Sequence, residues 1–281
     1  MRPVDVNDCP MFFSNRHRRR LFGVYHEPVT RASTDLGVVF CHPLGEEKQY
    51  SDRAYVKWAR HFAAAGYPTL RFDGYGFGDS EGDLVEATVH SLCADTMDAM
   101  TKLCELASVS RFALIGARFG ATIAALVAAT DQRVAGLVLC SPIVSGGSYR
   151  ETILRSLQVS ELAGGKKAKK REELLAEIKR SGRFALDAQL ASGALMEQLA
   201  AVNLLDETKG FLGPRIVTAL TAESADRVEV MRLEDAYRAE SRGLINWDED
   251  RDFWSHKSLY DGYLPTTLYD RTASWLGELQ A

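Results

Sequence analysis

The chain has 281 residues, of which 46% are apolar and 26% are charged, and its formal net charge at pH 7 is −4. This composition is typical of a globular protein that can bury a substantial core. The mild negative charge argues against nucleic acid as the main partner, because phosphate binding needs a concentrated basic surface. No stretch approaches the roughly 20 uninterrupted apolar residues of a membrane span.

The N-terminal residues lack the apolar stretch of a secretory signal. The five cysteines are odd in number and show no C-x-x-C spacing, which favours reduced thiols over a disulfide framework or a zinc site. We therefore expect a cytoplasmic protein without a metal or other cofactor. A homodimer is left open as its assembly state.

The first predicted elements form an antiparallel hairpin, in which residues 10–14 and 19–26 flank a polar turn. From residue 37, short apolar runs alternate with segments of helical periodicity. This alternation predicts βαβ units, and hence a parallel sheet. The predicted strands lie at residues 37–41, 68–73, 111–116 and 134–140, and the predicted helices lie within 50–65, 85–106 and 119–129.

After residue 142 the alternation stops. Residues 148–205 show only helical periodicity and predict a helical cap inserted over the sheet, while residues 1–147 and 206–281 form the α/β core. The remaining predicted elements are strands at 215–220 and 228–233, a polar and aromatic loop at 234–262, and a final helix at about 265–279.

A lysine-rich run at residues 166–170 lies inside the predicted cap. It is either a patch that binds an anion or a partner, or the solvated start of a helix. In the second interpretation Glu172 and Glu173 supply the opposite charges along the helix.

Four motifs each follow a predicted strand, where the carboxyl ends of parallel strands meet at one edge. Pro43, in the first motif, has no N–H, so Leu44 is the expected backbone donor of an oxyanion hole there. In the third motif, glycines flank a sharp strand–turn–helix elbow where Cβ atoms would clash. The motifs are CHPLGEE (41–47), DGYGFGDSEG (73–82), GARFG (116–120) and SPIVSGGSY (141–149).

In their order and spacing, these motifs resemble the α/β-hydrolase family, in particular its serine-aminopeptidase-like branch. More narrowly, the chain is similar to exosortase-system-associated hydrolases, whose elbows often read G-L-R-x-G. The resemblance covers nearly the whole chain. It implies an eight-stranded, mostly parallel sheet with helices on both faces and a helical cap after strand six. In the parent family the elbow reads G-x-S-x-G and its serine is the nucleophile, whereas this chain has Arg118 there.

The same resemblance implies an acid after strand seven and a histidine after strand eight. The positional candidates are Glu223, with Asp226 as second choice, and His256. His256 is alternatively an ordinary surface histidine of the loop. His42 is expected to order the oxyanion loop by hydrogen bonding rather than to act as a base.

Arg118 cannot be the nucleophile, because a guanidinium stays protonated and offers donors but no lone pair. The elbow aims it at the start of the following helix, where the N–H groups of Phe119 and Gly120 also point. An arginine there would turn an oxyanion hole into a clamp for a carboxylate or phosphate. The alternative is an internal ion pair with Glu46, Glu47 or Asp73.

A third alternative gives Arg118 a supporting catalytic role beside a displaced nucleophile, for which Cys140 and Ser141 are the nearest candidates. Cys140 is alternatively a buried apolar residue. Two functions therefore stay open, with a pure interaction scaffold as a weaker third. One is a non-catalytic protein that binds a small anionic or acyl-type ligand through Arg118, His42, Leu44, Phe119 and Ser141. The other is an active hydrolase or acyltransferase.

Overall fold

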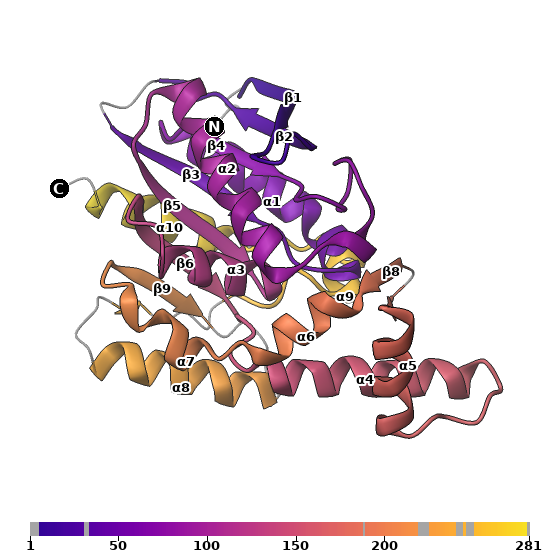
Figure 1. Cartoon of the computed structure of the whole chain (residues 1–281). Helices are drawn as coiled ribbons and strands as arrows, with labels where there is room; N and C mark the ends of the chain where they lie inside the picture. The colour runs from indigo at the N-terminus through magenta and orange to yellow at the C-terminus, as the bar shows by residue number, and fades with distance from the viewer. Residues whose placement is uncertain are drawn as a thin grey trace.

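The centre of the molecule is one eight-stranded sheet with the strand order β1-β2-β4-β3-β5-β6-β9-β10 (Figure 1). The structure is a computed structural model and describes residues 6–30, 34–187, 189–218, 225–239, 244–245 and 250–279. The first two pairings in that order are antiparallel and the other five are parallel, which confirms the predicted sheet. The strands are β1 (Asp8–Ser14), β2 (Arg20–His26), β3 (Leu36–Cys41), β4 (Thr69–Phe72), β5 (Arg111–Ala117), β6 (Val134–Cys140), β9 (Arg215–Thr218) and β10 (Leu244–Ile245).

Helices cover both faces of this sheet (Figure 1). α1 and α10 share one apolar core, while α2, α3 and α8 belong to the other. In β3, Val38 and Phe40 belong to the first core, and Val39 and Cys41 to the second, as expected where successive side chains point to opposite faces. The helices are α1 (Glu46–Ala64), α2 (Val89–Ala107), α3 (Phe119–Ala128), α4 (Gly146–Ala163), α5 (Arg171–Ser181), α6 (Gly193–Ala201), α7 (Leu204–Glu207), α8 (Ala225–Ala239), α9 (His256–Tyr260) and α10 (Thr266–Glu278), with 3₁₀ turns η1 (Leu84–Glu86) and η2 (Thr208–Gly210).

Long-range hydrogen bonds fix the position of α1 against α10. The Trp58 indole donates to the Thr272 hydroxyl at 3.0 Å, and the Tyr269 hydroxyl donates to the Ala54 carbonyl at 2.8 Å. The rings of Trp58 and Tyr269 stack with centroids 5.5 Å apart. The helix that carries the oxyanion-loop motif at its start is therefore held rigidly on the sheet. In the part of the chain that the structure describes, no helix is long and apolar enough to cross a membrane.

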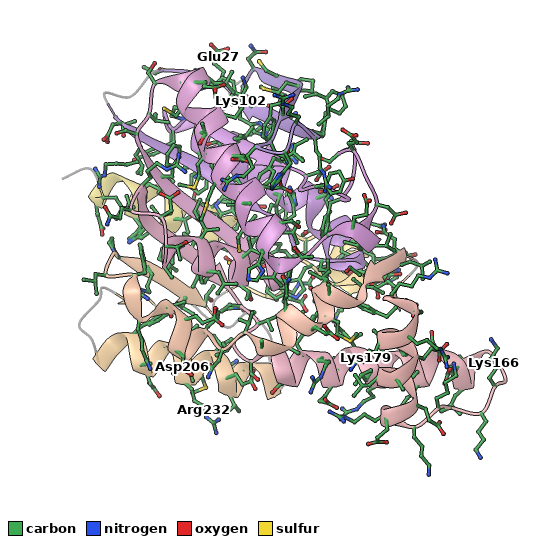
Figure 2. The ribbon with its side chains drawn as sticks, in the orientation of Figure 1. Glu27, Lys102, Lys166, Lys179, Asp206 and Arg232 are labelled. Atoms are coloured by element: carbon green, nitrogen blue, oxygen red, sulfur yellow. The ribbon has the colours of Figure 1, made fainter. Side chains whose placement is uncertain are left out.

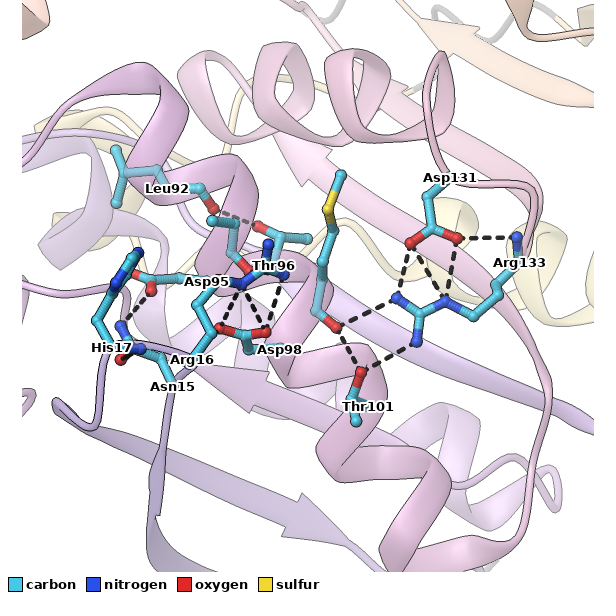
Figure 3. Close-up of polar contacts among 12 residues, drawn as sticks. Asn15, Arg16, His17, Leu92, Asp95, Thr96, Asp98, Thr101, Asp131 and Arg133 are labelled. Carbon is cyan, nitrogen blue, oxygen red and sulfur yellow. Dashed lines mark hydrogen bonds and ion pairs between the residues drawn. The ribbon is translucent and has the colours of Figure 1, made fainter.

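The turn between β1 and β2 is anchored to α2 by polar contacts (Figure 3). The Asn15 amide donates to Asp95 at 2.7 Å, and the Arg16 guanidinium pairs with Asp98 at 2.9 Å. Asp95 also accepts the Tyr75 N–H at 2.8 Å, so one buried carboxylate holds both this hairpin and the loop after β4.

The predicted strand at 228–233 is wrong, because this segment lies in α8. Val228 and Met231 are exposed, whereas Val230, Leu233 and Tyr237 are buried. These three residues are spaced by three and four positions, as on one face of a helix. The pattern extends past residue 233, where the six residues interpreted as a strand end. The last strand is β10, and the predicted loop at 234–262 contains both β10 and α9.

The segment between β6 and β9, which we call the insert (residues 146–207), contains the predicted helices and also a hairpin that the prediction missed. Its strands are β7 (Arg183–Leu186) and β8 (Gln189–Ser192). Phe184 and Leu186 are buried between exposed neighbours, an alternation too short to distinguish from helical periodicity. Ser145, directly before the insert, forms a β-bridge with Asn203, near its C-terminal end. Figure 1 shows α4 and α5 projecting beyond the sheet.

Candidate functional site

A sharp elbow connects β5 to α3, and Arg118 is its central residue. Arg118 has φ 53° and ψ −125°, a conformation unusual for a residue with a side chain. A Cβ on Gly116 would lie 2.5 Å from the Ala121 nitrogen, and one on Gly120 would lie 2.1 Å from the Cys41 carbonyl oxygen. Only glycine fits on either side of the elbow, because backbone occupies the space.

The Arg118 side chain is buried and paired within the protein. Its Nε donates to Glu47 Oε1 at 3.0 Å, and its Nη1 donates to the Ser141 carbonyl at 3.3 Å. Arg118 is 7% exposed, and Glu47 lies in the first turn of α1. Of the three acids that the sequence offered as internal partners, Glu47 is the one in contact.

The other two acids have different partners. Asp73 pairs with Lys48 at 3.0 Å and accepts the Asp79 N–H at 3.0 Å. Glu46 accepts a hydrogen bond from the Tyr50 hydroxyl at 2.6 Å. Two adjacent ion pairs, Arg118 with Glu47 and Lys48 with Asp73, therefore line this edge of the sheet.

Leu44 and Phe119, the residues expected to donate in an oxyanion hole, lie in the loop after β3 and at the start of α3. Leu44 and Phe119 are almost fully buried, and neither backbone N–H has a hydrogen-bond acceptor among the residues that the structure describes. The Tyr55 hydroxyl accepts from the Ala117 N–H at 2.9 Å and donates to the Cys41 carbonyl at 3.2 Å. Tyr55 thus joins the elbow to the loop after β3, so the two segments that carry the donors are held together.

His42 lies in that loop with its ring stacked on Tyr55, the centroids 4.7 Å apart. Its Nδ1 is 3.9 Å from Asp52 Oδ1, too far for a hydrogen bond. Burial, with the nearby charges of Lys48 and Arg71, holds the pKa of His42 well below its usual range. His42 is therefore neutral at physiological pH, and it fixes the loop by stacking rather than by the expected hydrogen bond.

A small cavity lies beside the elbow, with a volume of about 30 Å³. That volume holds about two water molecules. Its polar lining comes from His42, Lys48, Asp73 and Thr96, and its apolar lining includes Phe72, Leu92, Phe119 and Ile123.

The proposed triad positions are not assembled at the elbow by any described contact. His256 is exposed at the start of α9, with its ring 5.7 Å from that of Tyr50 and 6.3 Å from that of Tyr260. Glu223 lies outside the described residues, as does the side chain of Asp226. The structure thus brings Arg118, His42, Leu44, Phe119 and Ser141 to one edge and leaves His256 on the surface.

The two candidates for a displaced nucleophile are inaccessible. Cys140 and Ser141 are both fully buried. Burial raises the pKa of the Cys140 thiol far above its usual range, so the thiol keeps its proton.

Sequence reasoning missed two residues of this edge. Tyr55 lies on the buried face of α1 together with Ser51, Trp58 and Phe62, a spacing that marks burial but not its bridging role. Asp187, in the turn between β7 and β8, accepts the Glu46 N–H at 2.8 Å. That contact joins the insert to the start of α1 across 141 positions, and no local pattern signals it.

Comparisons with known proteins identify the family and the fold. The sequence model of the family described as "Serine aminopeptidase, S33" matches residues 32–190, more than half of the chain. No curated protein sequence matches the chain.

Several solved structures are similar in fold. A hypothetical protein from Pseudomonas aeruginosa, PA2218, superposes with a TM-score of 0.67 at 18% identity, over 98% of this chain and 94% of the other. Est1E from Butyrivibrio proteoclasticus, solved with ferulic acid bound, gives 0.70 at 15% identity, over 96% and 98%. The Pyrococcus furiosus esterase Pf2001 gives 0.62 at 16% identity, over 98% and 92%. With the strand order and the family match, these likenesses establish that the chain has the α/β-hydrolase fold and belongs to the serine aminopeptidase S33 family.

Proposed function

We propose that this protein keeps the fold of the serine hydrolases without their chemistry. In this proposal it binds a small anionic or acyl-type ligand at the elbow, beneath a cap formed by the insert. The observation that carries the loss of chemistry is Arg118, which occupies the nucleophile position and is ion-paired with Glu47 at 3.0 Å. That pair is the internal alternative to an anion clamp, so in this proposal the backbone donors, rather than Arg118, bind the anion. Its G-x-R-x-G elbow also supports assigning the chain to the exosortase-associated subgroup of the family.

The loss of hydrolase chemistry follows from what a serine-type mechanism requires. The nucleophile must lose a proton to a base within hydrogen-bond reach, and a guanidinium has no lone pair with which to attack. All six histidines of the chain are described, and none of their described hydrogen bonds or ion pairs reaches the elbow. His42, in the loop after β3, is stacked on Tyr55, and it has no described hydrogen bond to the elbow.

Ligand binding is supported by the backbone donors that the fold retains. A buried N–H without an acceptor costs about 1–3 kcal/mol, so a ligand oxygen that accepts from Phe119, which lines the cavity, would recover that cost. The Phe119 N–H is also the first of α3, where the helix dipole favours a negative charge. Lys48 lies on the same cavity wall, where it is paired with Asp73, so its ammonium would have to turn from that carboxylate to meet a ligand anion. A cavity of about 30 Å³ admits only the oxygen-bearing end of such a ligand.

The competing function, hydrolysis or acyl transfer by a displaced nucleophile, has less support. It would need Cys140 or Ser141 to reach a substrate, and both side chains are fully buried. The raised pKa of Cys140 opposes formation of the thiolate that would attack.

A labelling experiment tests the catalytic half of the proposal. The wild-type protein should form no covalent adduct with a fluorophosphonate probe and should turn over p-nitrophenyl esters only at trace rates. Arg118→Ser should also stay inactive, because no described contact places a histidine within hydrogen-bond reach of the new hydroxyl. Saturable ester hydrolysis that Ser141→Ala or Cys140→Ala abolishes would establish the competing function.

Thermal shift tests the ligand-binding half. A panel of short carboxylates, acyl carboxylates and phosphates should contain compounds that raise the melting temperature in a saturable way, in proportion to RT ln(1 + [L]/Kd). Lys48→Met should weaken this stabilisation, whereas Lys57→Met, an exposed cation elsewhere on α1, should not. A wild-type protein indifferent to every compound would refute ligand binding at the elbow.

A further inference from the structure

The projecting end of the insert carries an excess of positive charge in an acidic protein. Residues 146–187 contain ten Lys and Arg side chains against six Asp and Glu. Their net charge is therefore +4, in a chain whose total is −4, which leaves −8 for the remainder. The molecule is thus an acidic body with a basic projection, and Figure 2 places Lys166 and Lys179 on that projection.

Most of these cations are not neutralised inside the insert. Lys169 pairs with Glu161 and Glu177, so the partners proposed from sequence, Glu172 and Glu173, are not the ones used. Glu173 instead accepts the Lys170 backbone N–H at 2.8 Å. Seven basic side chains have no ion pair among the described residues, namely Arg155, Lys166, Lys167, Lys170, Lys179, Arg180 and Arg183.

An exposed apolar pair lies beside these cations on α4. Val159 is 59% exposed and Leu162 is 60% exposed. With exposed Arg155 they follow a spacing of four and three residues, so the three side chains share one face of the helix. Lys166 and Lys167 follow in the turn after this helix. The opposite face of α4 is the one that packs, through buried Ile153 and Leu154.

We propose that this basic and apolar tip (Arg155, Val159, Leu162, Lys166, Lys167 and Lys170) docks the protein on the surface of an anionic lipid bilayer. Basic side chains near such a surface are attracted to acidic headgroups, and apolar side chains on the same helix face enter the boundary with the acyl chains. The acidic body is repelled by the same surface, so the charge separation also orients the molecule, with the tip toward the bilayer.

A bilayer fits these observations better than a nucleic acid or a second copy of the chain. A phosphate backbone would use the cations but gives Val159 and Leu162 nothing apolar to contact. The acidic body of a second copy could pair with the cations, but such a head-to-tail contact builds rings or open filaments, an outcome that the test below distinguishes. The docking surface is separate from the elbow, so it stands or falls independently of the proposed function.

Vesicle sedimentation of the full chain tests this inference. The protein should pellet with phosphatidylcholine vesicles that contain phosphatidylglycerol and should stay in solution with phosphatidylcholine alone. Raising the ionic strength from about 0.1 M to about 1 M should release most of it, because the screening length falls from about 10 Å to about 3 Å. Lys166→Gln/Lys167→Gln should lower the partition coefficient by roughly 30-fold, at about fivefold for each basic side chain.

Two matched controls make the result specific. Val159→Ser/Leu162→Ser should also weaken binding, while Leu212→Ser, which removes an apolar side chain exposed elsewhere, should not. Lys57→Gln/Lys257→Gln removes the same number of exposed cations outside the tip and should have little effect. Equal binding by tip and control variants would overturn the proposal, as would failure to bind anionic vesicles. The proposal would also fail if duplex DNA bound the protein as tightly as anionic vesicles do, and bound Val159→Ser/Leu162→Ser equally well. It would fail too if the protein self-associated, Lys166→Gln/Lys167→Gln abolished that self-association, and vesicles did not compete with it.

Discussion

The elbow and the tip of the insert both depend on basic side chains, but in opposite ways. Arg118 is 7% exposed and is fixed by the carboxylate of Glu47 and the carbonyl of Ser141. Lys166 and Lys167 are exposed and have no ion pair among the described residues. Because Arg118 is buried, loss of its partner should lower the stability of the fold. The two lysines are solvated, so they should contribute little to stability and can attract an anionic surface at long range.

Replacing a glycine by alanine in each region should give the largest difference in unfolding free energy. Gly120→Ala places a methyl group 2.1 Å from the Cys41 carbonyl oxygen, so it should cost about 3 kcal/mol of unfolding free energy or more. Gly164→Ala, in the turn at the tip, meets nothing closer than 3.4 Å and should change stability by less than about 0.5 kcal/mol. Urea denaturation measures both. Similar losses in the two variants would show that the elbow is not the tightly packed region described.

A double-mutant cycle should show the next largest effect. Glu47→Gln and Arg118→Met should each cost about 1.5–3 kcal/mol, because each leaves a mostly buried partner without its charge. The double variant should cost clearly less than the sum. The exposed pair Lys102–Glu105, 3.0 Å apart, is the control and should couple by less than about 0.5 kcal/mol. Additive losses at Glu47 and Arg118 would contradict a coupled pair.

Titration of histidines sharpens the same contrast between buried and exposed groups. Burial, with the Arg71 charge, lowers the pKa of His26 from 6.5 to about 4. Between these values the unfolded chain binds a proton that the folded chain does not, so stability should fall as the pH drops from 6.5 toward 4. The slope from this residue is at most about 1.4 kcal/mol per pH unit.

His26→Gln should therefore lose less stability than the wild type between pH 7 and pH 5. Part of the loss should remain in the variant, because the pKa of His42 is lowered too. Denaturation curves at the two pH values decide this, and identical slopes in His26→Gln and wild type would contradict the assignment.

The smallest expected effect is at the tip itself. Lys166→Gln/Lys167→Gln should change the free energy of unfolding by less than about 0.5 kcal/mol, because both side chains are exposed and have no ion pair to lose. A larger loss in thermal or chemical denaturation would mean that these lysines support the insert rather than serve binding.

Local patterns in the sequence were enough to predict the core of the fold. The strands from 37–41 to 134–140 and the helices between them were predicted because each is a continuous apolar run or a regular helical repeat. The elbow was predicted because Gly116 and Gly120 mark places where backbone leaves no room for a Cβ. The segment 228–233 was misread because six residues fit two periods equally well, and the hairpin β7–β8 was missed because its strands have four residues each.

The sequence by itself determined the mostly parallel sheet, the position of the elbow and the presence of an arginine at its centre, because these depend on periodicity and on single residue types. Only the tertiary structure decided that Arg118 pairs with Glu47 rather than with Glu46 or Asp73, and that Asp187 of the insert binds the start of α1. Those partners are 71 and 141 positions apart in the chain. Such contacts depend on how helices and loops pack on the sheet, and on which acid a buried guanidinium can reach, and neither is written in any local pattern.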